Sequence, residues 1–446
     1  MENFDRMTAK ISEYVRVTGI PAFAVGIVRG QDLVYARGFG RVRRHGSDDE
    51  VTPDTVFPSC STAKPLAGSM IMKLVEGGLL ELDRPVIEYL PRLQYPEGGD
   101  VSRVTLRHLL THTSGLSSDP DFPGRFFRDG PESLGDHVRM DVPCYKVIGP
   151  PGQVFWYSNP GFNIAGYLAE YVTGTNFSKL VNDLILAPAS MTATSFDPAS
   201  RLTEAMVEVE DVAPPAHLPI PYPAGGAVTT IRDLSKFAIS HMHGGVLPQG
   251  RLLEDATVSQ MHTVQADSYS RAPRWYGLAF VIEFHNGRKL VSHGGGGFGC
   301  GSNFVMVPEE KTAVITLFNH PAGYDVRVGQ ILDEMLGPAE RSAAKPKESD
   351  QDYRPLHAGT YSSVWPGDDY PTEIVVTCSK DSLQVAVDGE DHVLTKVDDA
   401  VYVTEDRRSS VGFVPGCRYL MYDSYGIGLV SAWPYRRMDS SSPTSR

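Results

Sequence analysis

Ser61 and Lys64 are the residues whose types and spacing point most directly to chemistry. They stand three positions apart in Ser61-Thr62-Ala63-Lys64, where a segment with apolar residues at helical spacing begins. Residues three apart share one face of a helix, so the lysine Nζ can reach the serine Oγ and take its proton. The free N–H groups of a helix start would stabilise an oxyanion. The alternative is a capping serine followed by a solvated lysine.

Tyr157-Ser158-Asn159 forms a second motif. Asn159-Pro160-Gly161 precedes an apolar helical stretch, which predicts a helix with Asn159 as its N-cap. Capping does not explain Tyr157. A tyrosine beside a lysine ammonium loses its proton more easily, so Tyr157 could act as a general base toward Ser61 and then as a general acid. The side-chain amide of Asn159 could bind a substrate carbonyl at the same time.

The third motif is His293 followed by a run of glycines that includes Gly294, Gly295 and Gly296. Residues without a Cβ allow a ligand backbone to approach closely, which makes Gly294 and Gly295 candidate substrate-binding residues. A flexible hairpin loop is one alternative. A phosphate-binding loop and a lipase-type oxyanion loop are others, but the chain has neither a G-K-[ST] nor a G-x-S-x-G sequence.

Together, the three motifs resemble those of the serine β-lactamase and penicillin-binding-protein superfamily, in its branch of esterases, D-aminopeptidases and peptide cyclases. They occur in that family's order and at similar separations. Two further segments resemble the family, Leu109–Gly115 (L-L-T-H-T-S-G) and Ala224-Gly225-Gly226 followed by Asp233-Leu234. The resemblance spans roughly residues 5–335.

The resemblance implies a role for each motif residue. Ser61 would be the nucleophile that becomes acylated, Lys64 would promote its deprotonation, and Tyr157 would transfer the proton. Asn159 would hold the substrate amide. The backbone N–H groups of Ser61 and Gly296 would form the oxyanion hole. The choice between Lys64 and Tyr157 as the base stays open from the sequence.

His293 is a departure from the family pattern. It stands where many relatives carry the lysine of a K-T-G motif, a cation that helps to bind the carboxylate of β-lactams and peptide C-termini. Histidine is neutral or charged near its ordinary pKa of about 6.5. Strong β-lactamase or carboxypeptidase activity is therefore not expected.

The elements that must position these residues are predicted from hydrophobic periodicity. Strands at both ends enclose helical patterns, so we expect an α+β domain with a mainly antiparallel sheet in which the first and last strands meet. The segments are a hairpin over 23–40, helices near 61–76, 105–111 and 161–172, and strands over 303–307 and 313–317. The resemblance implies a β-lactamase/transpeptidase-like fold, with helices flanking the sheet and an all-helical lobe.

The texture of the chain changes after a polar segment. We expect a catalytic domain over 1–337, a linker over 338–352, an all-β domain over 353–435 and a disordered tail over 436–446. The β-rich part resembles the lipocalin-like barrels appended to several family members. We expect this barrel to cover the active-site cleft, with Trp365 and Tyr370 reaching toward it, and a separate lipid-binding role is the alternative.

Composition excludes several function classes. The 446 residues carry a formal net charge of −13, which argues against nucleic-acid and membrane-surface partners. No apolar run is long enough for a transmembrane helix, and no signal pattern opens the chain, so we expect a cytoplasmic protein. The five cysteines are scattered and form no C-x-x-C pair. We therefore expect no metal and no cofactor; the oligomeric state, a homo-oligomer included, stays open.

Three functions are compatible with the sequence. The leading one is a serine hydrolase that works through an acyl-enzyme. It would cleave an amide or ester of a small molecule or of a peptide, including peptides with D-residues. The second is an acyltransferase or stand-alone peptide cyclase that releases a thioester-bound peptide. The third is a non-enzymatic sensor or scaffold, which has no need of Ser61, Lys64 and Tyr157 together.

Overall fold

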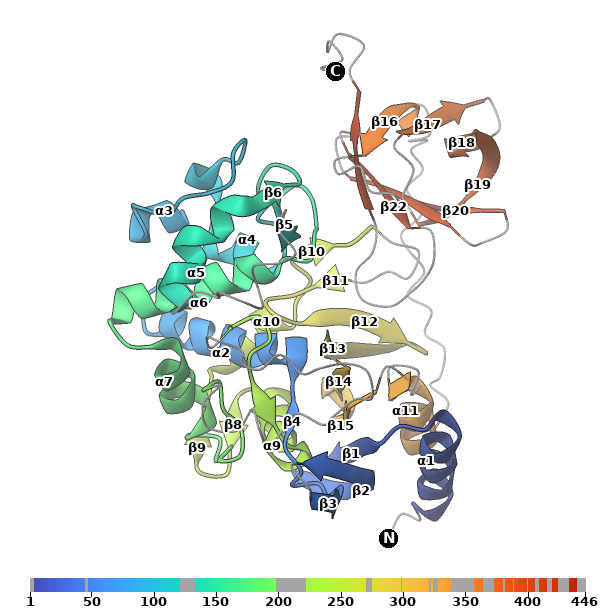
Figure 1. The fold of residues 1–446 in the computed structure, drawn as a ribbon. Helices are drawn as coiled ribbons and strands as arrows, with labels where there is room; N and C mark the ends of the chain where they lie inside the picture. The colour runs from blue at the N-terminus through green and yellow to red at the C-terminus, as the bar shows by residue number, and fades with distance from the viewer. Residues whose placement is uncertain are drawn as a thin grey trace.

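A computed structural model of the protein shows a large α+β domain followed by a small β-barrel (Figure 1). In the first domain the structure describes residues 4–44, 47–120, 133–197, 222–269, 275–297, 299–320, 322–323 and 328–337. In the barrel it describes residues 357–363, 373–379, 382–387, 389–398, 400–405, 409–414, 419–423 and 433–438. The predicted linker lies outside these ranges, as do Trp365 and Tyr370.

A nine-stranded antiparallel sheet forms the centre of the first domain. Its strands, in spatial order, are β10 (Ala266–Asp267), β11 (Trp275–Tyr276), β12 (Val281–His285), β13 (Arg288–Gly297), β14 (Cys300–Val307), β15 (Thr312–Phe318), β1 (Ala22–Arg29), β2 (Asp32–Arg44) and β3 (Ser47–Glu50). The first and last long strands pair, with Phe23 opposite Phe318. Every residue of β15 is buried, because helices cover both faces of the sheet.

Two terminal helices cover one face of the sheet. They are α1 (Asp5–Thr18) and α11 (Val328–Leu336), whose Ile11 and Ile331 pack with Phe23 and Val314 in one apolar cluster. On the other face, α9 (Ile231–Met242) crosses β1 at Gly26. A Cβ at Gly26 would lie 2.4 Å from Ile231 Cγ2, so glycine lets the helix approach the strand closely.

The remaining helices build the lobe beside the sheet (Figure 1). The central one is α2 (Ala63–Glu76), which is buried almost all round, as expected of a helix with apolar residues on every side. The others are α3 (Val86–Tyr89), α4 (Leu106–Leu110), α5 (Leu134–Met140), α6 (Asn159–Thr173), α7 (Phe177–Val181) and α10 (Asp255–Met261). Short antiparallel strand pairs lie outside the large sheet: β4 (Phe57–Pro58) with β7 (Val228–Thr229), β5 (Leu116–Pro120) with β6 (Tyr145–Val147), and β8 (Val246–Leu247) with β9 (Gly250–Arg251).

The C-terminal domain is a closed antiparallel barrel. Its strands are β16 (Gly359–Ser363), β17 (Glu373–Cys378), β18 (Leu383–Val387), β19 (Glu390–Asp398), β20 (Val401–Thr404), β21 (Ser410–Phe413), β22 (Tyr419–Asp423) and β23 (Trp433–Arg437). Pairing of β16 with β23 closes it, so its strands leave no open edge. Large aromatic side chains such as Tyr361, Tyr435 and Phe413 fill the core. The last strand reaches Arg437, two residues past the predicted end of the domain.

The barrel packs against the first domain at the β10–β11 end of the sheet (Figure 1). Val414, Tyr419 and Met421 of the barrel form one buried apolar cluster with Ile148 and Val154. The predicted α+β domain, its helical lobe and the following barrel are thus confirmed. Within the described ranges, no helix has the length and apolarity needed to cross a membrane.

Candidate active site

Ser61 lies on a 3-10 turn, Cys60–Thr62, that runs directly into α2. The sequence predicted a helix that opens at Ser61, and the helix proper begins two residues later. The turn is held to the sheet: Ser302 Oγ donates to Ser59 O at 2.7 Å and lies 2.6 Å from Thr62 Oγ1. Cys60 has φ +49°, a left-handed value that non-glycine residues rarely adopt, and such strain is found most often at functional sites. Ser61 itself remains half-exposed.

Lys64 lies in the first turn of α2 with its side chain completely buried. Its Nζ lies 3.1 Å from Ser61 Oγ, 2.8 Å from Asn159 Oδ1 and 2.6 Å from Ala224 O. It also lies 4.6 Å from the centre of the Tyr157 ring. Burial lowers the pKa of Lys64 well below its ordinary value, because the ammonium is desolvated. The predicted contact between Lys64 and Ser61 is therefore present, and the amine is held by two further acceptors.

Tyr157 stands on the other side of Ser61, just before α6. Burial raises the pKa of Tyr157 far above its ordinary value, and a hydrogen bond with Ser61 offsets only part of that rise. Its ring lies 4.2 Å from that of His112, whose Nδ1 accepts a hydrogen bond from Ser158 N at 2.9 Å. The phenol is thus neutral and fixed in place. The expected phenolate next to a charged lysine is not what this burial favours.

Asn159 is the first residue of α6 rather than its N-cap. Ser158 is the cap, because its Oγ accepts from Gly161 N at 3.3 Å. The predicted cap was thus wrong by one residue. Because Ser158 caps the helix, the Asn159 side chain makes other contacts: its Oδ1 accepts from Lys64 Nζ at 2.8 Å and its Nδ2 donates to Ser118 Oγ at 3.3 Å. Asn159 therefore positions the lysine. The substrate amide that the resemblance led us to expect at Asn159 would have to bind to the same side chain as Lys64.

His293 is buried on β13 and is neutral. Its Nδ1 lies 2.6 Å from Gly294 O, and a carbonyl can only accept, so Nδ1 carries the proton. Its Nε2 lies 2.9 Å from Tyr276 Oη and accepts from that hydroxyl. Burial and the nearby charge of Lys64 lower the pKa of His293 to about 3. Of the two states that the sequence left open, burial favours the neutral one. Tyr276 has no signal in the sequence.

The glycine run continues β13 instead of forming a loop. Strand β12 pairs with β13 only as far as Ser292, whereas β14 follows β13 to Gly297, so among the described strands the segment from His293 onward pairs on one side only. A Cβ at Gly295 would lie 2.5 Å from Ser59 O and 2.8 Å from Ser61 N. Glycine is therefore required there for the strand to lie against the nucleophile turn. Gly294 and Gly296 lie on the same segment, one residue to either side.

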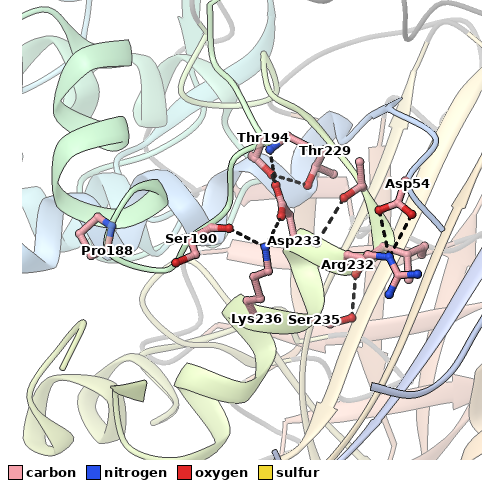
Figure 2. Close-up of polar contacts among 12 residues, drawn as sticks. Asp54, Pro188, Ser190, Thr194, Thr229, Arg232, Asp233, Ser235 and Lys236 are labelled. Atoms are coloured by element: carbon pink, nitrogen blue, oxygen red, sulfur yellow. Dashed lines mark hydrogen bonds and ion pairs between the residues drawn. The ribbon is translucent and has the colours of Figure 1, made fainter. Parts of the chain in front are cut away.

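The supporting segments of the sequence have structural roles. The Asp233 carboxylate accepts from Ala193 N at 2.8 Å and from Thr194 Oγ1 at 3.0 Å, and Lys236 pairs with its other oxygen (Figure 2). Thr194 Oγ1 lies 2.9 Å from Thr229 Oγ1 of β7. Figure 2 shows this network at the start of α9, where it joins the helix to the 190–195 loop. These contacts hold the 190–195 loop and β7 against the start of α9.

The cysteines near the site are not activated thiols. Burial raises the pKa of Cys60 to about 12 and that of Cys300 to about 11. Among the described residues, no three His, Cys, Asp or Glu side chains lie close enough together to bind a metal ion. The fold thus brings together the three side chains that the sequence singled out, Ser61, Lys64 and Tyr157.

The family follows from comparison with known proteins. A family model described as Beta-lactamase matches residues 7–333, so the chain belongs to the beta-lactamase family. Among curated proteins it is similar to "Unguisins hydrolase ungD'" of Aspergillus campestris (strain IBT 28561), 26% identical over 325 residues. That match covers 67% of this chain and 58% of the relative, so the chain spans less than two thirds of that relative's length.

Two other comparisons complete the picture. Penicillin-binding protein 4 of Amycolatopsis lactamdurans is 28% identical over 316 residues, covering 67% of this chain and 81% of the relative. A solved structure titled "Crystal structure of SurE with D-Leu" superposes with a TM-score of 0.65 at 21% identity. It covers 97% of this chain and 99% of that chain, so the likeness in fold extends over both domains.

Proposed function

We propose that this protein is a serine hydrolase that cleaves an amide or ester bond through an acyl-enzyme on Ser61. The position of Lys64 Nζ carries the proposal. A neutral amine has two N–H bonds and one lone pair, and the acceptors Asn159 Oδ1 and Ala224 O take the two N–H bonds. The lone pair is then directed at Ser61 Oγ, 3.1 Å away.

In the proposed mechanism, Lys64 takes the proton of Ser61 as Oγ attacks the substrate carbonyl. The resulting oxyanion is stabilised by the N–H groups of Ser61 and Gly296. Tyr157, a neutral phenol in contact with Ser61, donates its proton to the leaving group and regains one from Lys64. Water, activated by the same pair, then attacks the ester and releases the acid.

The neutral state of His293 supports a substrate without a carboxylate next to the scissile bond. An uncharged imidazole that accepts from Tyr276 offers no cation for the carboxylate of a penicillin or a peptide C-terminus. Peptide amides and simple esters fit this site better. The relative named "Unguisins hydrolase ungD'" and the similar structure titled "Crystal structure of SurE with D-Leu" support amides that contain D-residues as a class to test.

Acyl transfer is the second candidate, and one observation favours it. Phe155 and Trp156, which directly precede Tyr157, pack in apolar clusters, the second of them together with the barrel. An apolar flank lowers the local access of water to an acyl-enzyme. An amine nucleophile, including the free N-terminus of the bound peptide, could then compete with water.

Intact-protein mass spectrometry of wild type and Ser61→Ala tests both candidates. The panel contains p-nitrophenyl esters, D-amino-acid amides, benzylpenicillin and a peptidyl thioester, each with and without an added amine. A Ser61-dependent adduct that water clears is the expected result. An adduct that persists in water but is cleared by the amine would establish the transferase. If no compound forms an adduct, the non-enzymatic scaffold takes the place of both.

A further inference from the structure

A chain of buried polar groups leads from α5 to Lys64. His137 Nδ1 donates to Asp141 Oδ2 at 2.8 Å, and Asn163 Nδ2 donates to His137 Nε2 at 3.0 Å. The other end of the amide, Asn163 Oδ1, accepts from Ala224 N at 3.2 Å. Ala224 O in turn accepts from Lys64 Nζ at 2.6 Å.

The direction of each bond in this chain is fixed by the one before it. The Ala224 N–H can only donate, so Asn163 Oδ1 must face it and Asn163 Nδ2 must face His137 Nε2, which accepts. His137 Nδ1 then donates to the Asp141 carboxylate. The amide of Asn163 therefore turns its NH2 group toward His137 and its oxygen toward the Ala224 N–H. A reversed amide would set two donors against each other at Ala224, a costly arrangement at a buried site.

Burial makes the chain rigid. His137 is fully buried and Asn163 is 3% exposed, and they come from neighbouring helices. Asn163 lies one helical turn beyond Asn159 on α6, so the two amides lie on the same face of the helix. One holds the amine directly at 2.8 Å, and the other holds the residue that supplies the second acceptor.

We propose that Asn163, itself oriented by His137 and Asp141, is a positioning residue that fixes the Ala224 carbonyl and thereby directs the lone pair of Lys64 at Ser61. This inference rests on the proposed function, because it deepens the role of the same lysine. Loss of the amide would release the Ala224 segment and let the amine rotate. Misplacement of a catalytic group by about 1 Å can lower a rate about 100-fold.

The test compares Asn163→Leu, His137→Phe and the double variant with wild type. The first readout is the rate at which a fluorophosphonate labels Ser61, measured on folded protein. We expect Asn163→Leu to lower this rate about 10- to 100-fold. The double variant should be no slower than Asn163→Leu alone, because both substitutions break one chain. Asn163→Ser replaces Asn163→Leu if the latter does not fold.

Ser69→Ala is the matched control. Ser69 is buried on α2, the helix of Lys64, and its hydroxyl pairs with His241 instead of with the Asp141–His137–Asn163 chain. It should label within twofold of wild type. The second readout needs no activity: the ¹³Cε resonance of Lys64, assigned with Lys64→Arg, should shift in Asn163→Leu and stay in place in Ser69→Ala. An unlabelled wild type would contradict the proposed function and leave this readout valid. An unshifted resonance, or unchanged labelling in Asn163→Leu, would overturn the positioning role.

Discussion

Burial acts in opposite directions on the two residues that could be the base. It lowers the pKa of Lys64 and raises that of Tyr157, because each loses its charged form when water is removed. In the proposed mechanism the deprotonated lysine can accept the serine proton, and the tyrosine keeps its own proton, which it can donate. The same physical effect lowers the pKa of His293 to about 3, so this imidazole carries no charge near neutral pH.

The pH dependence of Ser61 labelling should report the lysine. Only the deprotonated amine can accept the serine proton, so the rate should rise with pH along a limb centred well below 10.5, the ordinary lysine value. Lys64→Arg should abolish labelling at every pH, because a guanidinium is not deprotonated in proteins. Labelling that survives in Lys64→Arg, or a rate that falls as the pH rises, would contradict Lys64 as the base.

Replacing Tyr157 by phenylalanine should remove the general acid. We expect acylation by p-nitrophenyl esters or amides to slow by a factor on the order of 10²–10⁴, with the larger loss for the poorer leaving group of the amide. Tyr95→Phe is a suitable control, since its hydroxyl donates to Ser114 O from a nearly buried position outside the site. Equal rates for Tyr157→Phe and this control would exclude proton transfer by Tyr157.

At the scale of elements, two buried histidines connect α9, the end of α10, and α2. His241 Nε2 lies 3.1 Å from Ser69 Oγ, and its Nδ1 lies 3.2 Å from Nε2 of His262. Burial lowers the pKa of His241 to about 3 and that of His262 well below its ordinary value. The unfolded chain therefore binds more protons than the folded one between about pH 6.5 and 3.

This pair should make the fold sensitive to acid. The stabilisation from neutral histidine is complete above pH 6.5 and is lost as the pH falls toward 3, by about 1.4 kcal/mol per pH unit for each histidine. In His241→Phe the free energy of unfolding should fall less steeply between pH 6 and 4, with a slope smaller than that of wild type by about 1.4 kcal/mol per pH unit. Urea unfolding at each pH measures it, with the barrel-surface variant His392→Gln as control. Parallel curves for wild type and His241→Phe would contradict the expectation.

At the scale of the whole molecule, the barrel is attached through a small apolar contact. Met421 and Tyr419 are buried against Ile148 and Val154, close in sequence to Tyr157. The core of the barrel is filled by its own aromatic side chains, which favours a role in covering the first domain over one in holding a lipid. This contact places the barrel beside the proposed acyl site.

A charge in that contact should separate the two domains. Met421→Asp would bury an unpaired carboxylate, which costs more than the contact contributes. We expect the radius of gyration from small-angle X-ray scattering to increase, with unchanged far-ultraviolet circular dichroism. Val393→Asp, on an exposed position of β19, should leave both quantities unchanged. An unchanged radius for Met421→Asp would show that other contacts hold the barrel in place.

The sequence by itself predicted the family, the two-part architecture and the three side chains of the proposed mechanism. Short-range patterns sufficed, because the Ser61–Lys64 spacing, the start of α6 and the alternation of strands are local properties of the chain. Only the tertiary structure decided that Ser158 and not Asn159 caps α6, that His293 is neutral, and that Ala224, Asn163 and Tyr276 belong to the site. Those features depend on burial and on partners that are distant in sequence, such as Ala224, 160 residues from Lys64. Desolvation and long-range hydrogen bonds set the protonation of each group, and neither leaves a local pattern in the sequence.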